Sequence, residues 1–342
     1  MADPKVVEWE EEKEEEANGN LMSHTNCYKL TNNPDYHNCM ISVENVRKAL
    51  NAAESLDNIT SLTENVAVLN CKHYRSDWER VFNAVVKIRV KKADGITTGT
   101  GFLTLRPPGY NPDTERGIFS NFAVMTNFHV VRQKGGLFLL VEPQNIEVIF
   151  FYDSKDSPVV KCEVSKISGT YSPFVPGKHT DEKLDFAMLY IKHPVDDEKM
   201  KRLKGLKPLL FEESGRVQAV EVRQIADKKR LCVIGHPHGA YKQIAFGELT
   251  TNTNGLYQEW KEACKEDFHS VEHSVATCGG SSGSPVILIG LKDGQPQYLI
   301  YSVLYVSFLH FRGDSQYGEA ASMQSILPSI RKGLQGLQDE RV

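Results

Sequence analysis

Short hydrophobic runs, separated by glycine, proline and polar residues, dominate the chain from about residue 84 onward. Runs of four to eight residues that are rich in β-branched and aromatic side chains are typical of strands. The first series of predicted strands covers 84–90, 99–104, 122–126, 146–150 and 186–191. The second series covers 231–234, 242–250, 274–278, 285–291 and 297–308. Asp293-Gly294, between the last two, is a tight-hairpin signal. Two strand series of similar size predict an all-β fold of two barrels or sandwiches, not a βαβ enzyme.

Helical patterns lie mainly towards the two ends of the chain. Residues 42–50 place apolar side chains at near-helical spacing, a weaker helix is expected over about 77–82, and a terminal helix over about 322–337. The chain therefore divides into an acidic tail (1–20), a partly helical N-terminal extension (21–83) and a β-rich domain (84–338). Within that domain we expect a first β unit over about 84–193, a connector over about 194–228, a second β unit over about 229–320 and the C-terminal helix over about 322–337.

Charge is concentrated at the N-terminus. Of the formal net charge of −4, residues 1–20 contribute eight acidic and two basic side chains, and the remainder of the chain is close to neutral. We expect a solvated, self-repelling tail, with a tail that guards a basic groove as the alternative. The balance does not favour nucleic-acid binding. The longest apolar run, 298–309, is too short to span a bilayer, and the N-terminus lacks the apolar stretch of a secretory signal.

The seven cysteines are widely scattered and include no Cys-x-x-Cys pair. An odd number without a secretory signal fits free thiols in a reducing compartment, so we expect a cytoplasmic or nuclear protein that is not secreted. His236 and His238 are the closest histidine pair, but Pro237 and the flanking glycines make that segment a turn without further ligands. We therefore expect no metal site and no cofactor.

Three segments carry candidate chemistry. Cys278-Gly279-Gly280-Ser281-Ser282-Gly283-Ser284-Pro285 is a tight turn that can expose one hydroxyl and direct successive N–H groups to one point, as the oxyanion of acyl transfer requires. His129 ends a hydrophobic strand, and Asp185 directly precedes another. The chain order of histidine, aspartate and serine is that of the chymotrypsin arrangement.

These motifs resemble those of the trypsin-like serine peptidases of the chymotrypsin double-barrel type, and the HtrA-like intracellular branch more than the secreted digestive enzymes. The matching segments are Gly101-Phe102-Leu103-Thr104, Thr126-Asn127-Phe128-His129-Val130, Asp185-Phe186-Ala187, Ile234-Gly235-His236-Pro237-His238-Gly239 and Gly280-Ser281-Ser282-Gly283-Ser284-Pro285. The resemblance covers about residues 84–335. It implies two six-stranded antiparallel β-barrels, with a C-terminal helix and a small helical N-terminal extension.

The resemblance also implies roles for individual residues. Ser282 would be the nucleophile, His129 the general base and then acid, and Asp185 the group that orients the imidazole. The backbone N–H groups of Gly280 and Ser282 would form the oxyanion hole. Asp181 is the alternative acid, although no strand directly follows it. Protein or peptide substrates are implied, and the oligomeric state is left open.

Two departures from the secreted enzymes stand out. Ser281 replaces the acid that pairs with a newly cut N-terminus, and no Arg/Lys-Ile-Val-Gly-Gly activation site precedes residue 84. We therefore expect activity without N-terminal cleavage, as in HtrA-like enzymes. The 58 residues after Ser284 are enough to finish a barrel and a helix, so we expect no PDZ domain.

The resemblance gives a coarse view of the substrate pocket. Its base would lie near Ala276 and Thr277, and its opposite wall near Ser302 and Leu304. Neither base residue is acidic, so we expect a preference for small-to-medium apolar or aromatic side chains over Arg or Lys.

Three alternatives remain open. An α/β-hydrolase is disfavoured because Ser284 stands where its nucleophile elbow has glycine. A cysteine peptidase with Cys278 as nucleophile fits the turn less well than Ser282. The strongest alternative is a catalytically silent protease fold that acts as a protein-binding module.

Overall fold

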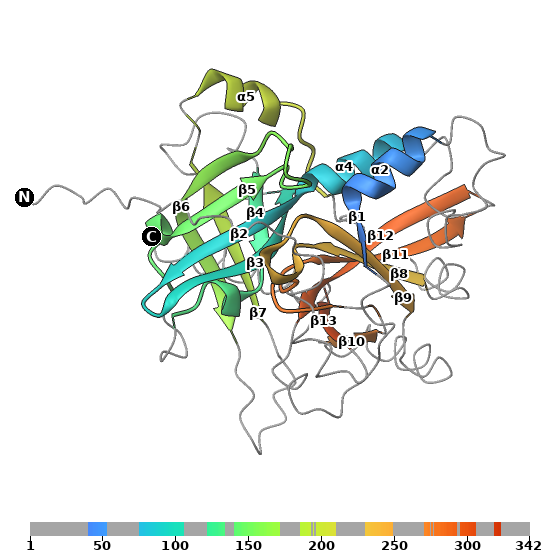
Figure 1. The fold of residues 1–342 in the computed structure, drawn as a ribbon. Coiled ribbons are helices and arrows are strands. Elements are labelled where there is room, and N and C mark those ends of the chain that lie inside the picture. Colours follow the sequence, from blue (N-terminus) through green and yellow to red (C-terminus); the bar gives the residue numbers. More distant parts are fainter. Residues whose placement is uncertain are drawn as a thin grey trace, which may run out of the picture.

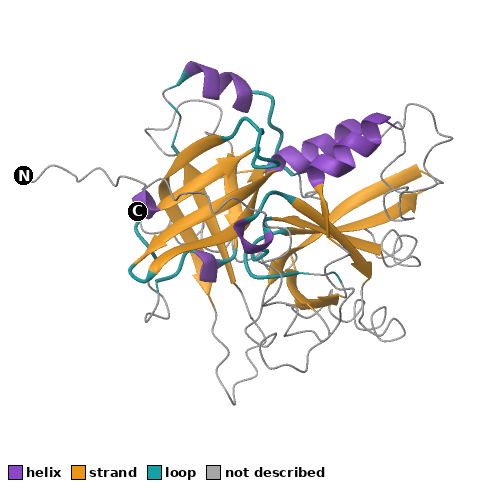
Figure 2. Cartoon of the chain, in the orientation of Figure 1, coloured by secondary structure: helices purple, strands orange, loops and turns teal. Residues whose placement is uncertain are grey.

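The computed structural model has two β-sheets side by side, with two helices above the place where they meet (Figure 1). It describes residues 40–52, 75–105, 122–133, 140–171, 185–192, 194, 196–209, 230–248, 270–273, 275, 277–292, 295–305 and 318–322. Strands make up most of this part of the chain (Figure 2). No helix in these ranges is long and apolar enough to cross a membrane.

The first sheet is a closed antiparallel barrel of six strands, in the spatial order β2-β3-β4-β7-β6-β5. Its strands are β2 (Val85–Lys92), β3 (Gly95–Leu105), β4 (Phe122–Thr126), β5 (Ile146–Phe150), β6 (Val160–Tyr171) and β7 (Asp185–Ile191). Gly101 lets two core side chains meet, since a Cβ there would lie 2.7 Å from Val124 Cγ1 and 2.8 Å from Ile88 Cδ1. The predicted six-stranded first barrel is confirmed.

The second sheet has seven strands in the order β1-β9-β8-β11-β12-β13-β10. Its strands are β1 (Met40–Ser42), β8 (Arg230–Gly235), β9 (Gln243–Glu248), β10 (Ser270–His273), β11 (Pro285–Lys292), β12 (Gln295–Tyr305) and β13 (Gly318–Ser322). The seventh strand is β1, which comes from the N-terminal extension and pairs with β9, Ile41 opposite Ile244. Lys292 faces Gln295 across the predicted hairpin, whose residues 293–294 lie outside the described ranges.

One expectation for this sheet changes. The strand predicted over 274–278 is wrong, because Val275, Thr277 and Cys278 are described outside any strand, and β10 ends before them at His273. Val275 and Cys278 are buried although they lie in a loop. Their apolar side chains therefore gave the segment the hydrophobic pattern of a strand. The predicted C-terminal helix (322–337) lies outside the described residues except for Ser322, the last residue of β13.

Three α-helices are described: α2 (Val43–Ala52), α4 (Arg75–Ala84) and α5 (Asp197–Leu203). The first two cover the helical patterns found in the N-terminal extension. The third lies in the expected connector and was not predicted, although its ends carry a clear signal. The Asp196 Oδ1 atom accepts hydrogen bonds from the N–H groups of Glu198 and Lys199, which is an N-cap, and Lys201 and Arg202 occupy the last turn.

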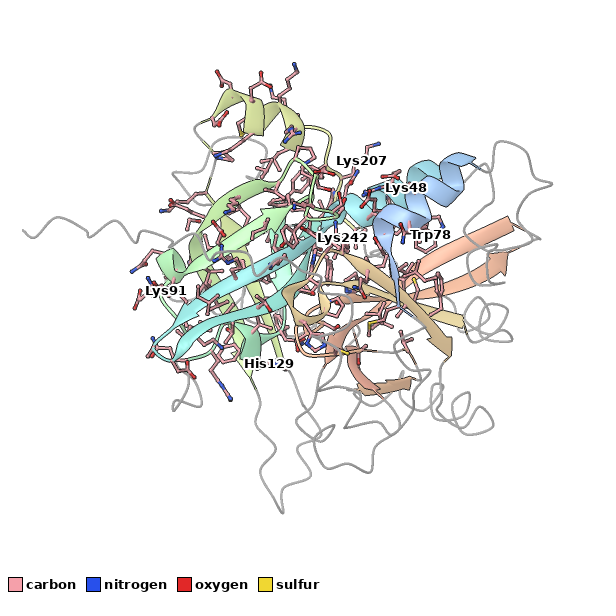
Figure 3. The ribbon with its side chains drawn as sticks, in the orientation of Figure 1. Lys48, Trp78, Lys91, His129, Lys207 and Lys242 are labelled. Carbon is pink, nitrogen blue, oxygen red and sulfur yellow. The ribbon has the colours of Figure 1, made fainter. Side chains whose placement is uncertain are left out.

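A cluster of four charged residues, which we call the junction cluster (Arg47, Glu79, Asp153 and Lys242), joins α2 and α4 to both sheets. Lys242 Nζ lies 2.7 Å from Asp153 Oδ1 and donates to the Phe82 carbonyl oxygen at 2.7 Å. Arg47 pairs with Asp153 and, at 3.0 Å, with Glu79. Lys242 is fully buried, beneath the helices (Figure 3).

The charges of the junction cluster depend on one another. Burial alone would raise the pKa of Asp153, but the neighbouring Lys242 and Arg47 charges lower it to about 2. Burial lowers the pKa of Lys242, and the Asp153 carboxylate opposes that shift. Each buried charge is thus compensated by an opposite one, as a buried ion pair requires.

Candidate active site

His129 and Asp185 are brought together by the pairing of two strands in the first barrel. β4 ends at Thr126, which lies opposite Ala187 of β7. Asn127 then leads into a single 3₁₀ turn, η6 (Phe128–Val130), which carries His129, while Asp185 begins β7. The two residues, 56 positions apart in sequence, therefore become neighbours at one end of the barrel. His129 lies in the lower half of the view in Figure 3, away from α2 and α4.

The Asp185 carboxylate holds His129 at two points. Its Oδ1 atom accepts a hydrogen bond from the His129 backbone N–H at 2.9 Å, and its Oδ2 atom lies 2.5 Å from the imidazole Nδ1. A carboxylate only accepts, so Nδ1 carries the proton and Nε2 of the neutral ring keeps its lone pair. The Asp185 side chain is 2% exposed, whereas that of His129 is 22% exposed and so reachable.

The Asp185 backbone is fixed as well. Asn127 Nδ2 donates to the Asp185 carbonyl oxygen at 2.8 Å, and Asn127 is itself fully buried. The alternative acid, Asp181, lies outside the described residues. Asp185 is thus the acid that the structure brings to His129.

The loop between Cys278 and Pro285 is a pair of successive tight turns. The Ser281 N–H donates to the Cys278 carbonyl oxygen and the Ser284 N–H to that of Ser281, both at 3.0 Å. Gly280 and Gly283 adopt φ values of +89° and +87°, which only glycine adopts without strain. We call this segment the serine loop (residues 278–285). Ser282 lies at its centre and is 7% exposed.

A second loop from the same sheet braces the serine loop. It follows β8 and contains the 3₁₀ turn η8 (Pro237–Gly239), in which His238 has a φ of +55°. The His238 N–H donates to the Gly279 carbonyl oxygen at 2.5 Å. A Cβ on Gly280 would lie 2.6 Å from the His236 carbonyl oxygen, so the two loops are in close contact.

His236 is a structural residue of this second loop. It is fully buried, and its Nδ1 lies 3.0 Å from the Ala240 carbonyl oxygen. Burial first, and then the Lys242 charge, lower the pKa of His236 to about 3, so the ring is neutral at physiological pH. The described ranges contain no group of three or more His, Cys, Asp or Glu residues that could hold a metal.

The serine loop and the His129–Asp185 pair are linked through β3. The Thr100 N–H donates to the Ser282 carbonyl oxygen at 2.8 Å. The Thr100 carbonyl oxygen accepts from Thr126 Oγ1 at 2.7 Å, three residues before His129. Sequence motifs identified His129, Asp185 and Ser282. They missed Thr100, because it lies within a predicted strand.

Only part of the expected substrate pocket can be placed. Ala276 lies outside the described residues, whereas Thr277 is half-buried and directly precedes the serine loop. Ser302 and Leu304 lie on β12, opposite Ser322 and Ala320 of β13, and their side chains lie outside the described part.

Comparison with known proteins identifies the family of the chain. The family model described as the trypsin-like peptidase domain matches residues 99–290, more than half of the chain. The chain therefore belongs to the trypsin-like peptidase family. It is a serine-type endopeptidase, a hydrolase whose substrates are proteins or peptides.

Several solved structures are similar to this chain. HL collagenase has a TM-score of 0.45 and 14% identity, covering 74% of this chain and 94% of its own. The Rv3671c protease from M. tuberculosis, in its active form, has a TM-score of 0.41 and 17% identity, covering 75% and 82%. The serine endoprotease from Yersinia pestis has a TM-score of 0.39 and 13% identity, covering 76% and 66%. No curated protein sequence matches the chain.

Proposed function

We propose that this peptidase cleaves peptide bonds through a covalent acyl-enzyme formed on Ser282, with His129 as the proton carrier and Asp185 as its orienting acid. The observation that carries the proposal is the double contact between the Asp185 carboxylate and His129. This contact leaves Nε2 as the free base on a partly exposed ring.

Acylation begins when His129 Nε2 takes the proton from Ser282 Oγ as that oxygen attacks the scissile carbonyl carbon. The imidazolium that forms is stabilised by the Asp185 carboxylate. The negative charge on the substrate oxygen is met by the backbone N–H groups of Gly280 and Ser282. The proton on Nε2 then passes to the leaving amine as the C–N bond breaks, and an ester on Ser282 remains.

Deacylation repeats these steps with water. His129 Nε2 takes a proton from a water molecule, whose oxygen attacks the ester carbonyl carbon. The ester bond breaks, the proton on Nε2 returns to Ser282 Oγ, and the carboxylic acid product leaves. No cofactor enters either half of the reaction.

The test compares three variants in the hydrolysis of a peptide library followed by mass spectrometry. Ser282→Ala and His129→Ala should each lower turnover by about 10⁴- to 10⁶-fold, because triad members act as a unit. Ser284→Ala is the matched control, since its hydroxyl is buried and bonds to nothing within the described part of the chain. A mild effect of His129→Ala contradicts the mechanism.

The same assay separates the remaining alternatives. Cys278→Ala should retain activity, because Cys278 is buried and only shapes the loop, its N–H lying 3.3 Å from Ser281 Oγ. Loss of activity in this variant with retention in Ser282→Ala would favour a cysteine peptidase. Two results together would favour the silent binding module: the wild-type protein cleaves no peptide, and Ser282→Ala binds protein partners as tightly as the wild type does.

We also propose that activity needs no N-terminal cleavage, as in the HtrA-like branch. Ser281 cannot pair with a new N-terminal ammonium, and the serine loop is instead braced by neutral hydrogen bonds from Thr100 and His238. Protein whose mass shows an intact N-terminus should be fully active. Activity that appears only after cleavage near residue 84 would contradict this proposal.

Specificity and compartment are proposed from the sequence of the pocket and the state of the thiols. Without an acid at Ala276 or Thr277, we propose cleavage after apolar or aromatic residues, and strict cleavage after Arg or Lys in the library would contradict it. Cys162 and Cys232 are free, buried thiols, in keeping with a reducing cytoplasmic or nuclear location. Fractionation of cells that express the tagged protein tests the location.

A further inference from the structure

Thr100 makes four hydrogen bonds around the proposed active site through its backbone N–H, its carbonyl and its hydroxyl. Its backbone N–H donates to the Ser282 carbonyl oxygen at 2.8 Å, and its carbonyl oxygen accepts from Thr126 Oγ1 at 2.7 Å. Its side-chain Oγ1 donates to the Gly280 carbonyl oxygen at 2.7 Å and accepts from the His236 N–H at 2.9 Å. The residue is fully buried.

The side-chain hydroxyl is the only group of Thr100 that another residue type would remove. A hydroxyl can donate and accept at once, and here it joins a carbonyl of the serine loop to an amide of the loop that contains η8. The His236 N–H is buried, and both bonds have good length, so loss of the hydroxyl would leave a buried donor and an acceptor unsatisfied.

These bonds fix the two peptide groups on either side of Gly280. The Gly279 carbonyl oxygen is held by the His238 N–H, and the Gly280 carbonyl oxygen is held by Thr100 Oγ1. A trans peptide is planar, with its C=O and N–H pointing in opposite directions, so a fixed carbonyl also fixes the N–H of the next residue. The His238 bond thus fixes the peptide that carries the Gly280 N–H, and the Thr100 bond fixes the next peptide, between Gly280 and Ser281. With this second peptide held, the backbone of Gly280 cannot rotate, so the Thr100 bond restrains the Gly280 N–H through the Gly280 backbone.

We propose that the Thr100 hydroxyl is a positioning group that holds the Gly280 N–H in the direction needed to bind the oxyanion. This inference rests on the proposed function. Thr100 touches no reacting atom and acts through the backbone of Gly280. Its effect should therefore fall on the rate of the chemical step, because a donor misplaced by about 1 Å can cost on the order of 10²-fold.

The experiment compares Thr100→Val, Thr100→Ser and a matched control, Thr104→Val, with wild type on one fluorogenic peptide. Thr104 is a buried threonine on the same strand, four residues further from the serine loop, and β3 pairs there with Leu209. For Thr100→Val we expect kcat to fall about ten- to a hundredfold, below the 10²- to 10³-fold typical of deleting an oxyanion donor outright. KM should change by less than about threefold, because ground-state binding does not use this donor.

Thr100→Ser should restore kcat to within about threefold of wild type, and Thr104→Val should leave kcat unchanged, since neither alters the bonds to Gly280. A purely structural role would instead lower the melting temperature and the active fraction of both valine variants without a selective effect on kcat. Should Thr100→Val fail to fold, Thr100→Cys, with its weak S–H donor, replaces it under the same expectation.

The outcomes distinguish this inference from the proposed function. An active wild type with a folded Thr100→Val or Thr100→Cys that keeps full kcat overturns the role of Thr100 alone. A folded Thr100→Ser that fails to restore kcat also overturns it. A wild type without Ser282-dependent activity overturns the proposed function, and the role of Thr100 with it.

Discussion

Among the individual residues, a single buried carboxylate, that of Asp185, determines how the His129 ring is placed. Asp185 binds both the backbone N–H and the Nδ1 atom of His129, so it fixes the position of the residue and the tautomer of the ring together. Neither bond could be read from the sequence, which shows only an acid before a strand and a histidine after one. The chain order of the motifs predicted the partners, and the pairing of β4 with β7 supplies the contact.

Asp185→Asn should lower kcat by about 10⁴-fold while leaving KM nearly unchanged. The amide of asparagine can donate to Nδ1, which favours the tautomer with the proton on Nε2, and that ring cannot act as a base towards Ser282. Steady-state kinetics on one fluorogenic peptide measure both constants.

Asp181→Asn is the matched control for this variant, since Asp181 is the other acid of the same segment. It should keep wild-type kinetics. A large loss of kcat in Asp181→Asn, with little loss in Asp185→Asn, would show that Asp181 and not Asp185 orients the His129 ring.

Thr100 shows why the residues that support the site could not be predicted from the sequence. In the sequence, Gly99-Thr100-Gly101 is part of an ordinary predicted strand. Its role depends on contacts to Gly280 and Ser282, about 180 positions away, and to His236, 136 positions away. Hydrogen-bond partners at such separations depend on how the two sheets are joined, which no local pattern encodes.

At the scale of elements, short-range patterns predicted most of the strands beside the site but not those that complete each sheet. β6 was missed although Val160, Cys162 and Val164 alternate with polar residues, which is a period-2 signal. β1 has three residues and is a strand only because β9 is there to pair with it. The helix α5 was missed because its cap, Asp196, lies in a stretch whose composition favoured a connector.

The two glycines at the start of the serine loop provide a test of its geometry. Gly280→Ala should abolish activity, because it combines a φ of +89° with a Cβ 2.6 Å from the His236 carbonyl oxygen. Gly279→Ala should leave activity within a few-fold of wild type, because no atom lies within 4 Å of the added Cβ. Turnover of the two variants on one substrate, with melting temperatures measured in parallel, gives the comparison. Equal activities would contradict the described loop conformation.

At the scale of the whole molecule, the junction cluster joins parts of the chain that are distant in sequence. Lys242 precedes β9 and reaches Asp153 after β5 and the Phe82 carbonyl oxygen of α4, while the Val43 N–H donates to the Lys242 carbonyl oxygen at 3.0 Å. The N-terminal extension is thereby tied to both sheets. We therefore expect the stability of the chain to depend on the charge of Asp153.

Protonation of Asp153 should lower the free energy of unfolding as the pH falls below about 4. Its pKa is about 2 when folded, against an ordinary value of 3.8, so the unfolded chain binds more protons between these values. The stabilisation is fully present above about pH 4 and is lost as the pH falls towards 2. Its size is on the order of 2 kcal/mol, from about 1.4 kcal/mol per pH unit. Urea unfolding at several pH values measures it.

In Asp153→Asn, the free energy of unfolding should no longer show the part of the pH dependence that comes from Asp153. At pH 7 the variant should be less stable by about 3–5 kcal/mol, because Lys242 is left buried without its anion. Glu163→Gln is the control, since its pair with Lys192 is exposed and worth less than about 1 kcal/mol. An Asp153→Asn variant as stable as Glu163→Gln would contradict the proposed contribution of the junction cluster.

Covalent labelling with a fluorophosphonate, followed by mapping of the label by mass spectrometry, tests whether Ser282 is an activated nucleophile. A serine that is activated by His129 and faces two oxyanion donors should be phosphonylated, so the label should reach one per chain and lie on Ser282. Ser282→Ala and His129→Ala should not be labelled, and Ser284→Ala should be labelled as wild type. Absence of label on folded wild-type protein, or a label on any residue other than Ser282, would contradict the mechanism.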